Sequence, residues 1–232
     1  MNLFNNYFPF HRIIIFLIIT FSTSQVRGQE INDSIPNSKF SIYIRPLSLI
    51  GNSSFQFGVD YRLPSFTRFG LVLGFGSSNL IKPTKFYILD YSIYEVHPQV
   101  QFFLKKQISR VNFALGGELI FANITSHLGV SRYAPSYNDL REFDSATLID
   151  KRRAFHFIGS VVIYLETHLV LESYFGLGFR SRMIEYRDIV NERLAWSGGS
   201  SLLPYSSGPS KKSDGEQGGL SATFGFKIGY RF

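Results

Sequence analysis

Cysteine is absent from this chain of 232 residues, and two other residue types are scarce, with two Met and one Trp. Without thiols the chain can form no disulfide, Fe–S cluster or cysteine-ligated zinc site, and it has no catalytic Cys and no acylated lipoprotein anchor. Charged side chains make up only 18% of the sequence, whereas about 25% is usual for a soluble domain. These absences exclude thiol chemistry and are unusual for an ordinary soluble protein.

Phenylalanine, tyrosine and glycine are abundant instead, with 24 Phe, 13 Tyr and 20 Gly. The length allows one domain or at most two small ones. One apolar run stands out, Ile13–Ile19, and it follows His11 and Arg12 in a segment, 1–28, that contains no acidic residue. A basic start followed by a short apolar run is typical of an export signal. The run is about half of the ~20 residues that a spanning helix needs, which disfavours the alternative of a membrane-anchored N-terminus.

Small residues mark where this signal ends. Val26 and Gly28 stand at positions −3 and −1 of a cleavage site before Gln29, as signal peptidases require. We therefore predict a signal peptide over 1–28, a short periplasmic lead over 29–38 and a mature domain over 39–232. Loss of the two arginines in the signal lowers the formal net charge from +7 to about +5.

Apolar and polar side chains alternate along two segments, Ser54–Leu63 and Leu220–Phe232. Successive side chains of a strand point to opposite faces, so each segment predicts a strand with one apolar and one polar face. Ordinary strands have ~5–6 residues, whereas membrane-spanning strands need ~9–11. The apolar faces comprise Phe55, Phe57, Val59, Tyr61 and Leu63, and Leu220, Ala222, Phe224, Phe226, Ile228, Tyr230 and Phe232.

Six further segments bring the number of predicted strands to eight. Ala154–Leu165 is apolar on both faces, which leaves its register open. An even number of strands is the rule for bacterial single-chain membrane barrels. The six segments are Lys39–Ile50, Phe69–Ser77, Ser92–Leu104, Arg110–Ala122, Ala154–Leu165 and Leu169–Arg180.

The connections between these segments differ in length according to the end at which they fall. Long outer loops and short periplasmic turns are typical of outer-membrane barrels. The first outer connection, 51–53, breaks this rule by being short. Tight turns are predicted at Pro64–Arg68, Lys105–Ser109 and Glu166–His168, and long outer loops at Ser78–Tyr91, Asn123–Arg153 and Ser181–Gly219.

The fold class predicted is therefore all-β: an eight-stranded antiparallel transmembrane β-barrel with up-and-down meander topology. Eight strands leave an interior just wide enough for side chains to fill, and buried charges persist there only when paired. We predict a plug of ion pairs instead of an open pore, with inward glycines leaving room for long side chains. The predicted network comprises Arg45, Asp60, Arg62, Glu95, Glu118, Glu172, Arg180, Lys227 and Arg231.

Two prolines, Pro46 and Pro98, lie inside predicted strands. Proline cannot donate a hydrogen bond to the ladder of a sheet. We therefore expect a bulge or a bend at each.

Three features carry a resemblance to a known group. The chain ends in Phe232 with Tyr230 two residues earlier, which resembles the C-terminal signal read by the barrel assembly machinery. The segments Ile44–Ile50 and Phe57–Leu63, and the Pro-containing His97–Leu104, are similar to the small outer-membrane barrels of Bacteroidetes, many of which are filed under a domain of unknown function. The resemblance implies a location in the outer membrane and no particular activity.

Catalysis has to be considered, because some eight-stranded outer-membrane barrels modify lipid A. Glu95 and His97 are neighbours on the predicted inner face, and a His beside a carboxylate can act as a general base. Ser41, Ser160 or Ser221 could supply a hydroxyl. No motif ties a nucleophile to the pair, so we favour the interpretation that both residues belong to the interior polar network.

Other chemistries find little support. The glycines of Gly70–Gly76 recur at period two inside a strand, whereas a phosphate-binding loop joins a strand to a helix. The histidines lack metal-ligand spacing, no nucleic-acid signature is present, and we predict no cofactor. Lys151–Arg153 and Lys211–Lys212 are either solvated loop charges or partners for lipopolysaccharide phosphates.

We predict an outer-membrane protein, without enzymatic activity, that serves a structural or surface-binding role through its long outer loops, since loops on a rigid scaffold commonly carry binding. Its expected partners are the assembly machinery and outer-membrane lipids, including lipopolysaccharide. One alternative is an enzyme that acts on lipid A or phospholipid. Another is a narrow channel or transporter for small or hydrophobic molecules. A soluble barrel of lipocalin type would require the opposite arrangement of faces.

Overall fold

The computed structural model describes eight stretches of the chain, all within the unit Pro36–Phe232. The predicted signal peptide and the lead 29–38 lie outside the described residues, as does the short connection 51–53. Among the described residues no helix has the length and apolar character needed to cross a membrane. The described stretches are 39–48, 54–63, 66–78, 88–104, 110–136, 139–165, 168–195 and 215–232.

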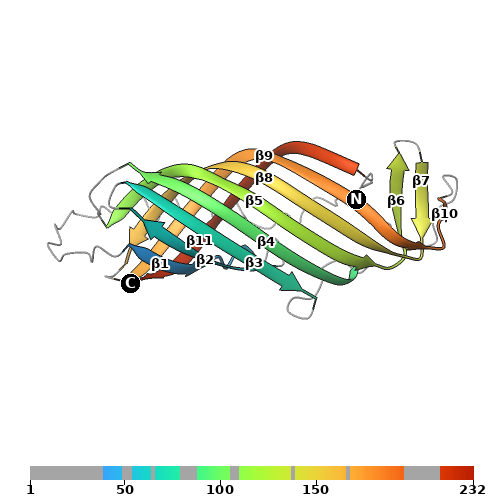
Figure 1. Ribbon diagram of the computed structural model, residues 1–232, viewed down its shortest axis with the longest axis horizontal. Helices are drawn as coiled ribbons and strands as arrows, with labels where there is room; N and C mark the ends of the chain where they lie inside the picture. Colours follow the sequence, from blue (N-terminus) through green and yellow to red (C-terminus); the bar gives the residue numbers. More distant parts are fainter. Residues whose placement is uncertain are drawn as a thin grey trace, which may run out of the picture. The chain divides into compact units, whose positions relative to one another are not determined.

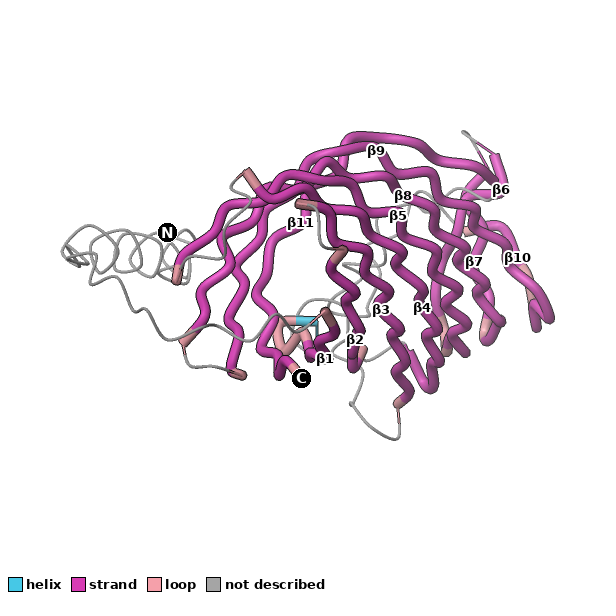
Figure 2. The backbone as a smooth tube through the Cα atoms, turned by 60° about the vertical axis from the view of Figure 1, so that its left-hand side comes forward, coloured by secondary structure: helices cyan, strands magenta, loops and turns pink. Residues whose placement is uncertain are grey.

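Eight strands form one antiparallel sheet that closes on itself, in the order β1-β11-β9-β8-β5-β4-β3-β2 (Figures 1 and 2). Consecutive strands of the ring pair throughout, and only the strands of a small second sheet intervene in the sequence, β6 and β7 between β5 and β8 and β10 between β9 and β11, so the predicted meander is confirmed. The strands of the ring are β1 (Phe40–Ile44), β2 (Phe55–Arg62), β3 (Thr67–Ser77), β4 (Ile88–Phe103), β5 (Val111–Leu128), β8 (Ser145–Tyr164), β9 (Leu169–Val190) and β11 (Gly215–Arg231).

The strands are staggered around the ring. We followed the paired residues from strand to strand around the ring, starting at Ile228 of β11. The path returns to β11 at Gly218, ten residues from its start. Such a stagger tilts the strands of a small barrel by roughly 35–45° to its axis. The path runs through Ile228, Ile44, Phe57, Leu73, Val96, Phe121, Arg153, Ser181 and Gly218.

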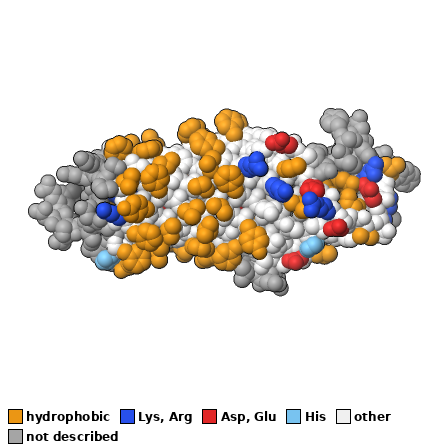
Figure 3. All heavy atoms as spheres, in the orientation of Figure 1, with side chains coloured by type: hydrophobic (Ala, Val, Ile, Leu, Met, Phe, Trp, Pro, Cys, Tyr) orange, Lys and Arg blue, Asp and Glu red, His pale blue; other side chains and the backbone are white. Residues whose placement is uncertain are grey.

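The faces of the strands agree with the sequence prediction. Phe57 and Phe224 on the outer face are 39% and 59% exposed, whereas Asp60 and Lys227 on the inner face are 4% and 3% exposed. Figure 3 shows hydrophobic side chains spread over one side of the ring. We call the outward-facing apolar surface of the ring the apolar belt. It includes the exposed side chains of Phe40, Phe57, Phe69, Leu71, Leu73, Phe75, Tyr94, Leu119, Phe121, Phe155, Phe175, Phe179, Leu220, Phe224 and Tyr230.

The two ends of the ring carry different connections. At what we call the tight end, the chain passes within a few residues from β2 to β3, from β4 to β5 and from β8 to β9. At the opposite head end, longer segments follow β3, β5 and β9. The predicted sorting of connection lengths is therefore confirmed.

The predicted loop Asn123–Arg153 is largely strand, which corrects the expected boundaries. β5 and β8 continue beyond Ala122 and Ala154 and pair as far as Leu128 and Ala146. The hairpin β6 (Ser131–Ser136) and β7 (Asp139–Phe143) then joins β10 (Arg193–Leu194) in a separate three-stranded sheet. Figures 1 and 2 show this sheet beyond the head end of the ring.

An apolar core joins the small sheet to the extended strands, and we call this part the head. Phe143 is completely buried, and the rings of Tyr133 and Tyr186 lie 4.6 Å apart. The core comprises Leu128, Tyr133, Phe143, Ala146, Leu148, Ile184 and Tyr186.

Neither proline produces the expected bulge. β1 ends at Ile44, and Pro46 lies in a turn that the Ser48 hydroxyl closes by donating to the carbonyl oxygens of Arg45, at 2.7 Å, and Ser54, at 2.8 Å. The strand predicted over Lys39–Ile50 is therefore too long. Pro98 keeps its place opposite Leu71, and the pairing of β4 with β5 skips it and resumes in the same register. The missing N–H interrupts the ladder without shifting it.

The ring closes over a short seam. β1 pairs with β11 only from Ser41 to Ile44, opposite Ile228–Arg231, whereas β9 pairs with β11 from Gly215 to Tyr230. Within the described residues, no strand pairs with β11 on its β1 side between Gly215 and Lys227. The seam is therefore the shortest junction in the ring.

Candidate functional site

The interior of the ring is filled by a buried polar network centred on two carboxylates, and Glu118 of β5 is the first. Arg45, which follows β1, donates from Nη2 to Glu118 Oε1 at 2.9 Å. His97 of β4 places Nδ1 3.3 Å from the same oxygen, and Gln99 also donates to it. On the other side of the ring of His97, Nε2 lies 3.3 Å from Glu95 Oε2. The imidazole therefore lies between two carboxylates.

Glu172 of β9 is the second centre. It accepts from Arg68 Nη2 at 2.7 Å and from Gln101 Nε2 at 3.2 Å, and Lys227 Nζ lies 3.3 Å away. Arg68 Nη1 also lies 3.3 Å from Asp60 Oδ2. Two cations therefore share this buried carboxylate, and one of them also serves a second acid.

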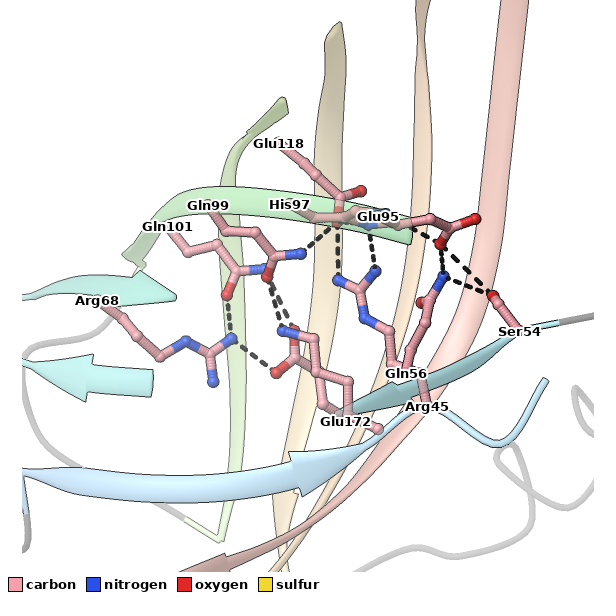
Figure 4. Close-up of polar contacts among 11 residues, drawn as sticks. Arg45, Ser54, Gln56, Arg68, Glu95, His97, Gln99, Gln101, Glu118 and Glu172 are labelled. Atoms are coloured by element: carbon pink, nitrogen blue, oxygen red, sulfur yellow. Dashed lines mark hydrogen bonds and ion pairs between the residues drawn. The ribbon is translucent and has the colours of Figure 1, made fainter. Parts of the chain in front are cut away.

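Gln99 joins the two centres. Its amide nitrogen donates to Glu118, and its amide oxygen accepts from Lys227 Nζ at 3.0 Å. Figure 4 shows these side chains converging from strands on different sides of the ring. A charge in hydrocarbon or protein interior is tolerated only when paired and hydrogen-bonded. We call this set the inner network: Arg45, Ser54, Gln56, Asp60, Arg68, Glu95, His97, Gln99, Gln101, Glu118, Glu172 and Lys227.

Four carboxylates in the inner network face three permanent cations. His97, between Glu95 and Glu118, is the group whose cationic form would balance them. Arg45 Nη1 also lies 3.4 Å from His97 Nδ1, so the imidazole contacts a guanidinium as well as the two carboxylates.

Tyrosine rings close the network where glycines leave room. The guanidinium of Arg45 lies 4.7 Å from the centre of the Tyr174 ring, and Lys227 Nζ lies 4.6 Å from the Tyr43 ring. Tyr174 packs over Gly225, where an added Cβ would lie 2.6 Å from its hydroxyl oxygen. The predicted role of inward glycines as space for long side chains holds here.

Two predicted members of the ion-pair plug, Arg62 and Arg231, contact aromatic rings. At the tight end Arg62 lies 4.1 Å from the Phe103 ring centre and donates to the Tyr164 hydroxyl at 3.3 Å. Arg231 lies 5.1 Å from the Tyr164 ring centre. The cavity between these side chains has a volume of about 20 Å³, which is room for about one water molecule.

The structure also adds one arginine to the predicted network and moves another out of it. Arg68 was expected in the turn Pro64–Arg68, but it is the second residue of β3 and faces inward. Extending the alternation of β3 back from Gly70 by two residues would have found it. Arg180 has an exposed side chain and forms no salt bridge with a described residue, so its predicted place in the plug is wrong.

The candidate catalytic pair, Glu95 and His97, is brought together, but without a nucleophile on the imidazole. Among the described residues, none of Ser41, Ser160 and Ser221 hydrogen-bonds to either member. The hydroxyl that reaches the pair is that of Ser54, which donates to Glu95 at 3.5 Å. A general base must accept the proton of the nucleophile it activates, so this geometry fits a structural network better than a catalytic triad. Within the described residues no cluster of three His, Asp or Glu is placed to hold a metal ion.

Between the inner network and the head, Asp150 of β8 is held by two arginines. Arg182 Nε donates to Asp150 Oδ1 at 2.7 Å, and Arg152 Nη2 donates to Oδ2 at 2.9 Å. Burial alone raises the pKa of this carboxyl, but the hydrogen bonds from Arg182 and Arg152 outweigh it and hold the pKa below its ordinary value. This part of the inner face therefore carries an excess of positive charge.

The predicted assembly signal lies at the tight end, beside the start of the ring. The backbone N–H of Phe232 donates to the Phe40 carbonyl at 3.1 Å, and its ring lies 5.2 Å from that of Tyr230. Both aromatic side chains face outward and are exposed.

Comparison with known proteins gives no family assignment: no protein-family model matches the chain, and no curated protein matches it.

Proposed function

We propose that the chain is an integral outer-membrane β-barrel protein, exported through a cleaved signal peptide, whose ring spans the membrane through the apolar belt. The observation that carries this proposal is the inverted arrangement of the faces. Large apolar side chains are exposed around the ring, while Asp60, Glu118, Glu172 and Lys227 are buried inside it. Water would penalise such a surface, whereas hydrocarbon favours it.

The distribution of aromatic residues supports the same proposal. Exposed aromatics occur toward both edges of the belt, with Phe40, Phe69 and Tyr230 near the tight end and Phe155 and Phe179 near the head end. Aromatic girdles at both membrane interfaces are typical of outer-membrane barrels. The closed sheet pairs the backbone groups of its strands with one another, as a spanning structure requires, except along the β1 side of β11 between Gly215 and Lys227, where no described strand pairs.

A non-enzymatic role in structure or surface binding fits best. The inner network and the cavity of about 20 Å³ leave little room for a solute, which disfavours the channel. Among the described residues, none of the candidate serine hydroxyls hydrogen-bonds to the imidazole of His97, and this disfavours the lipid-modifying enzyme. The head is a folded platform at the end expected to face outward, and it offers a surface for a partner.

Fractionation of cells that express the full chain tests this proposal. The mature protein, beginning at Gln29, should remain in the membrane after a carbonate wash and should require detergent for extraction. Its folded form should migrate differently on gels before and after boiling. Recovery in the aqueous fraction would contradict the proposal. Lipid A mass spectra and single-channel conductance, each with and without the protein, test the enzyme and the channel.

A further inference from the structure

A groove of about 500 Å³ opens on the outer face of β5, β8, β9 and β11, at the head-end edge of the apolar belt. We call it the outer groove. Its apolar lining comes from Leu119, Phe121, Phe155 and Phe179, all of which are exposed. Volumes of 300–1,000 Å³ are typical of ligand sites. The groove is therefore large enough to take part of a hydrophobic ligand.

The outer groove is open because position 218 is a glycine. Gly218 of β11 pairs with Ser181, so it belongs to the outward-facing set, and an added Cβ there would meet only a carbonyl oxygen at 3.8 Å. A side chain could stand at this position without a clash. The open space is therefore a consequence of the residue type.

Cations border the groove where the belt ends. Arg153 lines it and Lys151 lies two residues further toward the head on the same outward face of β8. Both are exposed, and neither forms a salt bridge with a described residue. Of the nearby acids, Glu185 pairs with Arg187 at 2.7 Å and is also influenced by the charge of Lys151, and Glu216 accepts from Ser181 at 2.7 Å.

We propose that the outer groove binds an acyl chain of lipopolysaccharide, while Arg153 and Lys151 bind a phosphate of its lipid A. The inference rests on the proposed outer-membrane location. Lipid A carries phosphates directly above several acyl chains, which matches cations directly above an apolar groove. Guanidinium groups bind phosphate through paired, charge-assisted hydrogen bonds.

Titration of the purified full-length barrel in detergent with lipopolysaccharide, followed by native mass spectrometry, tests the headgroup contact. Arg153→Gln is expected to weaken binding about tenfold, the loss typical of one charged hydrogen bond. The matched control is Arg110→Gln, which removes an exposed cation at the tight end and should leave binding unchanged. Dephosphorylated lipid A should bind more weakly and should not distinguish the Arg153 variant from the parent protein.

A second pair of variants tests the groove. Gly218→Leu fills it and should weaken binding of both lipid A forms, whereas Ala222→Leu, at an exposed outward position of β11 that does not line the groove, should not. Equal affinity of the Arg153 and Gly218 variants and the parent protein would overturn the inference. So would phosphatidylglycerol binding as tightly as lipopolysaccharide with the same sensitivity to Arg153.

Retention of the boiling-dependent gel shift in every variant separates this inference from the proposed location. A membrane-embedded barrel that ignores lipopolysaccharide would contradict the groove assignment alone. A protein that is soluble without detergent would contradict the location.

Discussion

The ring and the head carry their apolar side chains on opposite faces of the same strands. Along β5, β8 and β9, the inner face of the ring carries Glu118, His156 and Glu172, while further along it carries Leu128, Leu148 and Ile184. The outer face changes in the opposite sense, from Phe155 to Lys151 on β8. A strand has no intrinsic inside, so the surroundings of each part determine which face is apolar. The polar outer surface of the head suits water, whereas the apolar outer surface of the ring, under our proposal, suits hydrocarbon.

Removing a carboxylate from the inner network is expected to destabilise the ring more than any other change considered for either part. Glu172→Ala leaves Arg68 and Lys227 buried without their shared partner, and we expect it to lower the free energy of unfolding by about 3–5 kcal/mol. Urea unfolding of the refolded protein, followed by circular dichroism, measures this loss. Glu216→Ala, which removes an exposed carboxylate, should change stability by less than about 0.5 kcal/mol. Similar values for both variants would show that the network does not hold the ring together.

In the head the corresponding change is the removal of an apolar side chain. Phe143→Ala empties the centre of the head core, and a loss of about 3–5 kcal/mol is expected locally. The ring should stay folded, so limited proteolysis should cut within 129–144 while the gel shift persists. Val130→Ala, at an exposed position, serves as the control. Loss of the gel shift together with proteolysis in the Phe143 variant would show that ring and head unfold as one unit.

A charge on the outer face distinguishes the surroundings of the two parts directly. Leu71→Arg, in the middle of the belt, should destabilise the protein in lipid vesicles by about 2–4 kcal/mol. Val190→Arg, on an exposed site at the end of β9, should cost less than about 0.5 kcal/mol. Equal tolerance of both substitutions would argue that the belt does not face lipid.

Acid is expected to have a smaller effect, and mainly on the head. Hydrogen bonds from Arg193 hold the pKa of Glu142 below its ordinary value, and hydrogen bonds from Asn191 and Arg193 do the same for Asp144. A carboxylate whose pKa is lower in the folded state than in the unfolded state stabilises the fold above the unfolded pKa of about 4. This stabilisation is lost as the pH falls from there through the folded-state pKa. The protection factors of the amides in 139–146, which correct for the pH dependence of the intrinsic exchange rate, should therefore fall between pH 5 and pH 3. Unchanged protection across this range would show that these ion pairs contribute little.

Much of the ring could be predicted from the sequence because alternation is a local property. Phe55–Leu63 and Leu220–Phe232 reveal both faces of a strand without any knowledge of its neighbours. The partners inside the ring depend on the stagger of all eight strands, which no single segment encodes. Arg62 and Arg231 were therefore correctly placed at inward positions, yet their aromatic contacts with Phe103 and Tyr164 could not be foreseen.

The head escaped prediction for a similar reason. Its core draws Leu128, Phe143, Leu148 and Ile184 from separate strands, and each of them is next to a polar or charged residue in the sequence. Asn123–Arg153 was predicted as a loop because it connects two segments with clear alternation of apolar and polar side chains. Only the packing of the hairpin against the extended strands turns these residues into a core.

The seam between β1 and β11 has a consequence for how the ring comes to exist. The first and last strands of the domain meet over Ser41–Ile44, and the final N–H of the chain is fastened to the carbonyl of Phe40. Because this junction joins the first and last strands of the ring, closing it brings together residues about 190 positions apart, which carries the largest loop-closure entropy of any strand pairing in the ring. The shortest ladder of the ring is therefore also the one with the most distant partners.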